Sequence, residues 1–185
     1  SPYQVVSIGL SSTAALVNVE RTGTTILTYP LVISGTSITV GTASAAWGLT
    51  SQGDILAYTA MDATTALVSN YGNGATAAYY VRTIIHNGTS APTIGTPTAL
   101  TGTFSGNMTY NGMCKLTSTT AFYFYSEAYT AKVITISGSS APTLGTTYTV
   151  SSTFGINFRR QVFALPYSST EVILQNYASS NYTVL

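Results

Sequence analysis

The chain has 185 residues, with only 6% charged side chains and a formal net charge of +1. Soluble proteins are about one-quarter charged on average, so hydroxyl groups rather than charges must hydrate this surface. The six lysines and arginines form no basic patch, which argues against nucleic acid as a partner.

Apolar residues make up 45% of the chain, but they come in short runs broken by Thr, Ser and Gly. No run approaches the roughly 18 apolar residues of a membrane helix, so we expect no membrane insertion. The chain begins at Ser1 without a signal-peptide pattern, as a mature protein or a fragment does. Cys114 is the only cysteine, and we expect it to be a buried small hydrophobic residue.

The first predicted unit covers residues 1–45. A hydroxyl cluster leads into an apolar triplet in the segment Leu10-Ser-Ser-Thr-Ala-Ala-Leu-Val17. A glycine-bounded phrase, Gly35-Thr-Ser-Ile-Thr-Val-Gly-Thr42, follows. Pro30 lies inside the third strand that we predict for this unit, which indicates a bulge or a local break there.

The second predicted unit covers residues 46–100 and repeats both landmarks. Met61-Asp-Ala-Thr-Thr-Ala-Leu-Val68 matches the hydroxyl-apolar cluster, and Gly88-Thr-Ser-Ala-Pro-Thr-Ile-Gly-Thr96 matches the glycine-bounded phrase. His86 is the only histidine and stands beside Asn87-Gly88, where we expect a solvated residue at a hairpin turn.

The third predicted unit, residues 101–151, displays the pattern most fully. We predict four strands, near 108–116, 121–125, 131–136 and 143–150, because β-branched and aromatic residues alternate between turn signals. The phrase Gly138-Ser-Ser-Ala-Pro-Thr-Leu-Gly-Thr146 stands 138 − 88 = 50 positions after its copy. A repeat of this period indicates an array of supersecondary units.

The fourth predicted unit, residues 152–185, begins like the others and has no fourth strand. Counted from Leu16, Leu67, Phe122 and Val172, the period is 51, 55 and 50 residues. The fold that we predict is therefore all-β, a propeller-like array of about three and a half four-stranded antiparallel blades in a single repeat domain. A small closed ring and a slice of a longer propeller both remain open.

The turn between the third and fourth predicted strands contains glycine for a clear physical reason. Glycine tolerates the positive φ that a tight reversal requires. Pro92 and Pro142 follow that turn, and proline offers no N–H to a neighbouring strand. The fourth strand of each unit is therefore predicted to be outermost.

The segment Val133-Ile-Thr-Ile-Ser-Gly-Ser-Ser-Ala-Pro-Thr-Leu-Gly-Thr146 and the Leu10–Val17 cluster resemble the repeats of propeller-like proteins in phage tail fibres, spikes and other surface proteins. The resemblance implies a virion-surface or extracellular structural protein that recognises host glycans. The chain departs from the pattern in two places, since unit one lacks the Ala-Pro pair and unit four lacks its last strand.

Tyrosine is abundant, with 14 copies, and suits both protein interfaces and sugar faces. Aromatic and amide residues adjoin the predicted turns between second and third strands, where they are expected either to pack at the edges of the sheets or to form a shallow glycan site. The candidate ligand-binding residues are Asn70, Tyr71, Asn73, Tyr129, Asn176 and Tyr177. Trp47, between units one and two, is expected to be either a wedge between blades or an exposed stacking platform.

The function that we expect is a non-enzymatic structural and recognition module, without cofactor or metal, whose partners are other subunits, further copies of itself, or glycans. One alternative is a fragment of a secreted propeller hydrolase acting on polysaccharide, with Asp54 or Glu127 in its channel. Another alternative is a self-assembling fibre or capsid-decoration subunit, which predicts a tyrosine-rich contact surface and paired terminal blades.

Overall fold

The computed structural model describes residues 4–21, 25–47, 55–73, 77–100, 111–125, 130–150, 162–176 and 182–184. Sixteen strands form four antiparallel sheets in these segments, and the described residues contain no helix. The predicted all-β class is confirmed. None of the described segments is a helix long and apolar enough to cross a lipid bilayer.

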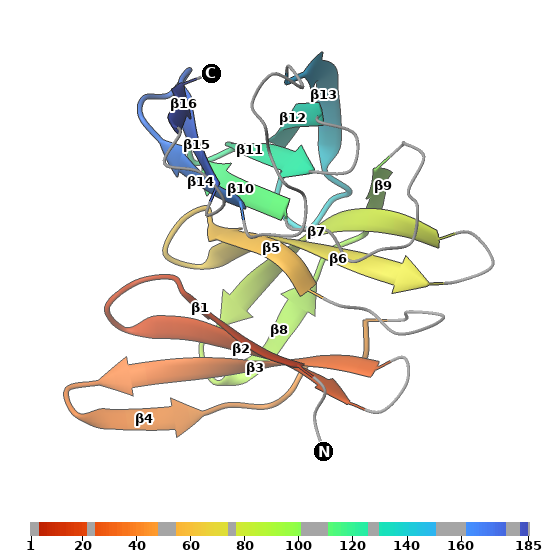
Figure 1. Ribbon diagram of the computed structural model, residues 1–185. Helices are drawn as coiled ribbons and strands as arrows, with labels where there is room; N and C mark the ends of the chain where they lie inside the picture. Colours follow the sequence, from red (N-terminus) through yellow and green to blue (C-terminus); the bar gives the residue numbers. More distant parts are fainter. Residues whose placement is uncertain are drawn as a thin grey trace.

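Each sheet is built from strands that are consecutive in the chain (Figure 1). The first sheet contains β1 (Gln4–Gly9), β2 (Ala14–Arg21), β3 (Thr25–Ser34) and β4 (Ser37–Val40). The second contains β5 (Ile55–Ala60), β6 (Thr65–Asn73), β7 (Ala77–Asn87), β8 (Ser90–Ile94) and β9 (Thr98–Leu100). The third contains β10 (Asn111–Lys115), β11 (Thr120–Tyr125), β12 (Thr130–Thr135) and β13 (Thr143–Thr149). The fourth contains β14 (Val162–Pro166), β15 (Val172–Asn176) and β16 (Tyr182–Val184).

The fourth strands are outermost, as the prolines predicted. β4, β8 and β13 each stand at the end of their sheet's strand order, and β9 pairs with the other half of β7. The three glycines that open the reversals into these strands have positive φ angles: 58° at Gly35, 63° at Gly88 and 54° at Gly138. This is the conformation that the tight turn required of them.

The turn between first and second strands is also the same in all four sheets. A side-chain oxygen accepts the backbone N–H two residues further on, which makes an Asx or Ser/Thr turn. The accepting residues are Ser11, Asp62, Thr117 and Ser168. They are separated by 51, 55 and 51 residues, so Ile173 rather than Val172 is the structural equivalent of Phe122. The hydroxyl clusters of the sequence are therefore turn-forming elements.

Pro30 does not interrupt its strand, so the predicted bulge is wrong. β3 pairs with β2 without a register shift from Thr25 to Val32. The carbonyl of Pro30 accepts the N–H of Gly41 at 2.9 Å, so the hydrogen-bonding groups of Pro30 point away from β2. Its missing N–H therefore falls at the end of the short edge strand β4, where it costs the sheet little.

Consecutive sheets pack face to face, and three hydrophobic clusters form the core. Ile8, Leu16 and Ile26 of the first sheet meet Ile55 and Val68 of the second. A larger cluster between the second and third sheets includes four tyrosines, Tyr71, Tyr79, Tyr123 and Tyr125. A third cluster joins the third and fourth sheets, with Phe122 and Phe124 packed near Val172 and Leu174.

The first strands of the sheets also follow one another. β5 contacts both β1 and β10, and β10 contacts β14. A side chain strengthens the first of these contacts, because Gln4 donates to the carbonyl of Ile55 at 3.1 Å and accepts its N–H at 2.8 Å. The sheets therefore fan out in chain order from a shared row of first strands (Figure 1).

Candidate functional site

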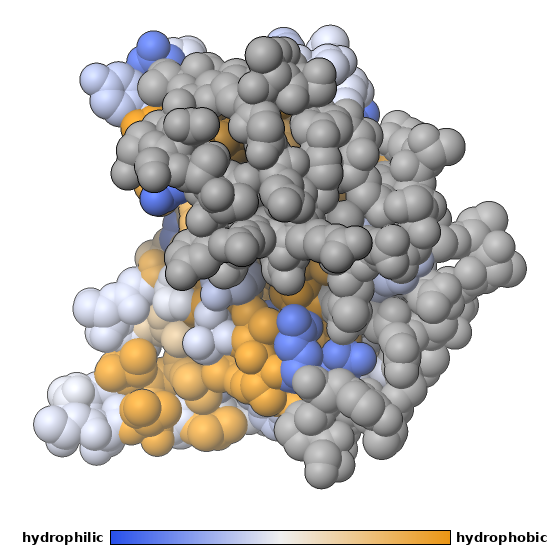
Figure 2. All heavy atoms as spheres, viewed as in Figure 1, coloured by the Kyte–Doolittle hydropathy of each residue, from blue (hydrophilic) through white to orange (hydrophobic). Residues whose placement is uncertain are grey.

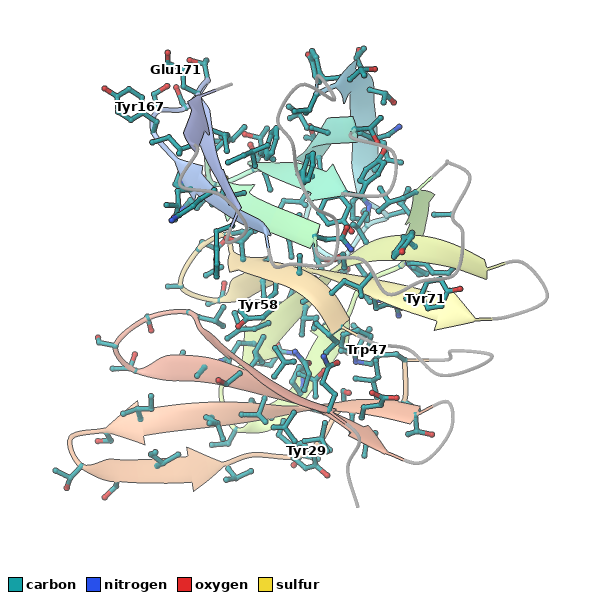
Figure 3. All side chains as sticks on the ribbon, in the orientation of Figure 1. Tyr29, Trp47, Tyr58, Tyr71, Tyr167 and Glu171 are labelled. Atoms are coloured by element: carbon teal, nitrogen blue, oxygen red, sulfur yellow. The ribbon has the colours of Figure 1, made fainter. Side chains whose placement is uncertain are left out.

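Trp47 lies between the first and second sheets (Figure 3). Its side chain is only 5% exposed, and its indole N–H donates to Thr28 Oγ1 at 3.0 Å. The Thr28 hydroxyl donates in turn to Asn18 Oδ1 at 2.7 Å. Because the indole ring is buried and its N–H is hydrogen-bonded, Trp47 is a wedge between the two sheets. The alternative prediction, an exposed stacking platform, is wrong.

Arg82 of β7 covers the ring of Trp47. The guanidinium carbon lies 5.0 Å from the ring centroid, and Nη1 donates to the Trp47 carbonyl at 3.1 Å. Burial lowers the pKa of Arg82 to about 10, and its side chain is 3% exposed. The cation is thus used inside the protein, through a cation–π contact and a backbone hydrogen bond, to fix the connection between two sheets.

Asn70 and Tyr71 lie within β6 rather than in an exposed loop. Asn70 is 0% exposed and Tyr71 is 9% exposed. The Tyr71 ring packs on that of Tyr79 at 5.2 Å between centroids. β6 is longer than we expected, because its pairing with β7 continues as far as Asn73 opposite Ala77. The shallow loop site predicted around Asn70 and Tyr71 is therefore not formed by these two side chains.

The other predicted ligand-binding residues are not brought together by the described structure. Asn73 ends β6 and Asn176 ends β15, where only their backbone pairing is described. Tyr129 and Tyr177 lie outside the described residues. Glycan binding by these four residues stays a prediction.

His86 occupies the predicted hairpin, but it is 9% exposed rather than solvated. The N–H of Gly88 donates to Nδ1 at 3.2 Å, which places the imidazole proton on Nε2. Nε2 lies 3.1 Å from the carbonyl of Leu31 and donates to it, across the gap between two sheets. His86 thus joins the second sheet to the first.

The carboxylate of Asp62 supports a turn between two strands of the second sheet. Asp62 accepts from the backbone N–H groups of Thr64 and Thr65, each at 2.7 Å. Partial burial raises the Asp62 pKa, but these hydrogen bonds outweigh it and lower the pKa below 3.8. Asp54 and Glu127, the candidate channel carboxylates, lie outside the described residues. The described part of the chain has no cluster of three or more metal-ligating side chains.

A groove that sequence reasoning missed runs between the third and fourth sheets. It has a cavity volume of about 430 Å³, and its described lining residues, all uncharged, are Leu116, Phe122, Ala131, Val133, Tyr148, Thr149, Val150, Thr170 and Val172. Tyr148 is 56% exposed at its edge, and three hydroxyl groups accompany the apolar floor. An apolar concavity with a few polar groups is the usual form of a small-ligand site.

The groove lies where the packing between neighbouring sheets differs from that between the first two sheets. Between the first two sheets, the fourth strand β8 packs against β3 and covers that interface. The fourth sheet has three strands among the described residues, and none of them contacts β13 to the extent that β8 contacts β3. One feature in the sequence pointed here, namely Tyr148 in a predicted edge strand.

Comparison of the chain with known protein families, with curated proteins and with solved structures gives no match.

Proposed function

We propose that this chain is a non-enzymatic structural and recognition module whose four sheets are arranged as the blades of a propeller-like array. Three features support the arrangement: four meandering sheets in chain order, face-to-face packing of each sheet on the next, and a continuous row of first strands. In propellers, first strands line the axis and fourth strands form the rim.

The recognition role is carried by one observation, the uncharged groove between the third and fourth sheets. A tyrosine at its edge and threonine hydroxyls along it offer both a ring for an apolar sugar face and hydrogen bonds for sugar hydroxyls. The ligand class proposed here is a neutral glycan, because none of the described lining residues is charged.

The structural role is supported by where the polar side chains are used. Arg82 and His86 bridge sheets, while Asp62 supports a turn. A virion-surface or extracellular location agrees with this role, since the hydroxyl-rich chain with 6% charged residues resembles surface proteins of that kind.

Binding of the chain to an array of neutral glycans tests the recognition role. We expect Tyr148→Ala to weaken binding about fivefold, because a stacked aromatic ring contributes on the order of 1 kcal/mol. Tyr167→Ala is the matched control, since Tyr167 is also exposed, at 69%, and does not line the groove.

Two results would contradict the recognition role. One is that the unaltered chain binds no glycan on the array. The other is that Tyr148→Ala and Tyr167→Ala bind as tightly as the unaltered chain.

A further inference from the structure

The three interfaces between sheets follow one rule. In each second strand, alternate residues point to the preceding sheet and to the following sheet. Leu16, Leu67 and Phe122 occupy equivalent positions and pack toward the following sheet. Val68 and Tyr123, one residue after Leu67 and Phe122, pack toward the preceding sheet. We call the side of a sheet that packs on the next sheet in chain order its following face, and the opposite side its preceding face. Every interface between two sheets of the chain therefore joins the following face of one sheet to the preceding face of the next.

The preceding face of the first sheet has no sheet against it among the described residues, yet it is made like the others. Alternation and register place Val5, Val17, Leu27, Leu31, Ile38 and Val40 on it. Val5, Ile38 and Val40 are 56%, 63% and 62% exposed. Figure 2 shows apolar side chains gathered over this sheet.

The following face of the fourth sheet also has no sheet against it among the described residues. Ile173, the equivalent of Leu16 and Phe122, lies on it with Phe163 and Leu165. Phe163 and Leu165 are 44% and 49% exposed. Their neighbour Ala164 points the other way, into the cluster shared with the third sheet. Among the described residues, this sheet is thus packed on one side and exposes apolar side chains on the other.

We propose that the following face of the fourth sheet in one copy of the chain packs against the preceding face of the first sheet in a second copy. The two end faces are the two halves of the interface that the chain already forms three times. Contiguous exposed apolar surface marks an interaction site. A contact between different faces joins copies head to tail, so it produces a ring or a filament.

This inference rests on the structural role proposed above and does not involve the groove. Failure of glycan binding therefore leaves it standing. Failure of head-to-tail association, conversely, leaves the glycan proposal and the arrangement within one chain unaffected.

Charge placed on one end face at a time tests the proposal. Ile38→Lys alters the first sheet's open face and Leu165→Lys alters that of the fourth sheet, both at positions exposed enough to accept lysine. The molar mass of each chain is measured by light scattering over a concentration series. We expect the unaltered chain to grow beyond one copy with concentration, and each variant alone to remain at 19.3 kDa.

The mixture of the two variants is the decisive sample. Each variant keeps one intact end face, and the two intact faces are complementary. We therefore expect an equimolar mixture to form a one-to-one dimer, with twice the 19.3 kDa mass of one chain, and nothing larger. A dimer in the mixture also shows that both variants are folded.

Thr39→Lys is the matched control, because Thr39 is an exposed residue of the same strand as Ile38 but points to the opposite face. It should associate like the unaltered chain. The proposal is overturned if the unaltered chain stays at one copy at every concentration, or if the mixed variants do not bind each other. It is also overturned if Thr39→Lys dissociates as fully as Ile38→Lys, since pairing along the edge of β4 would then be the contact.

Discussion

β11 in the third sheet and β2 in the first sheet occupy equivalent places in the repeat, but they are buried differently. From Ala121 to Tyr125 every side chain of β11 is buried. In β2, buried residues alternate with half-buried ones from Ala14 to Glu20. Among the described residues, a middle sheet has a neighbouring sheet on both faces and an end sheet has one on a single face. Equivalent strands are therefore buried on both faces in a middle sheet and on one face in an end sheet.

The largest expected effect comes from comparing equivalent leucine and isoleucine positions in a middle sheet and an end sheet. Leu67 is 0% exposed between two sheets, whereas Ile173 is half-buried on an open face. We expect Leu67→Ala to lower the free energy of unfolding by about 2–5 kcal/mol, and Ile173→Ala by about 1 kcal/mol.

Urea denaturation in dilute solution measures both values, because dilution keeps end faces of different copies apart. Equal losses at the two positions would mean that the end sheet is as fully packed as the middle one. The comparison between middle and end sheets would then fail.

The difference between the sheets was not predictable from the local sequence. Ala15-Leu-Val17 and Ala66-Leu-Val68 are identical triplets, and both predict a strand that is apolar on its two faces. Val68 is nevertheless 0% exposed, while Val17 is half-buried. Whether a neighbour covers an apolar face depends on the order of sheets in space, which a repeat does not encode locally.

Strands and turns were predicted well, because their signals are local. The glycines at positive φ, the edge position of the fourth strands and the hydroxyl turns all follow from a few adjacent residues. The candidate site was predicted poorly for the opposite reason. Tyr71 resembles a loop residue in sequence, but it is buried in a core cluster that also contains tyrosines of the next sheet, more than 50 positions further on.

The second prediction, of intermediate size, concerns how the free energy of unfolding falls at alkaline pH. It depends on two buried groups of a middle sheet, the third. Burial raises the pKa of the Cys114 thiol from 9.0 to about 11, and it raises the pKa of the Tyr123 hydroxyl. Both groups stay neutral in the folded protein at a pH where the unfolded chain ionises. The contribution of the Cys114 thiol to stability is therefore complete below pH 9.0 and is lost as the pH rises through about 11. The contribution of the Tyr123 hydroxyl is complete below pH 10.0 and is lost only at higher pH.

We expect Cys114→Ala to flatten the fall in unfolding free energy between pH 9.0 and about 11, by at most about 3 kcal/mol for a shift of about two pKa units. Tyr123→Phe should flatten the profile at higher pH. Unfolding curves at a series of pH values measure both slopes. A profile that is as steep in Cys114→Ala as in the unaltered chain would show that the thiol is accessible to ionisation in the folded state.

The smallest expected effect concerns the turns, where end and middle sheets should behave alike. Ser11 of the first sheet and Asp62 of the second each accept an N–H group within their own turn, with no contribution from a neighbouring sheet. We expect Ser11→Ala and Asp62→Ala each to lower the free energy of unfolding by about 1 kcal/mol near neutral pH.

Low pH should affect the Asp62 turn but not the Ser11 turn, because only Asp62 is ionisable. The hydrogen bonds of Asp62 lower its pKa below 3.8, so its contribution is present above pH 3.8 and is lost as the pH falls through the folded-state value. The difference between the unaltered chain and Asp62→Ala should therefore shrink below pH 3.8, while the difference for Ser11→Ala stays constant. One of the two variants could instead lose more unfolding free energy than the hydrogen bonds of its own turn explain. Neighbouring sheets would then stabilise the turns as well as the faces of a sheet, and the contrast between middle and end sheets would extend to the whole unit.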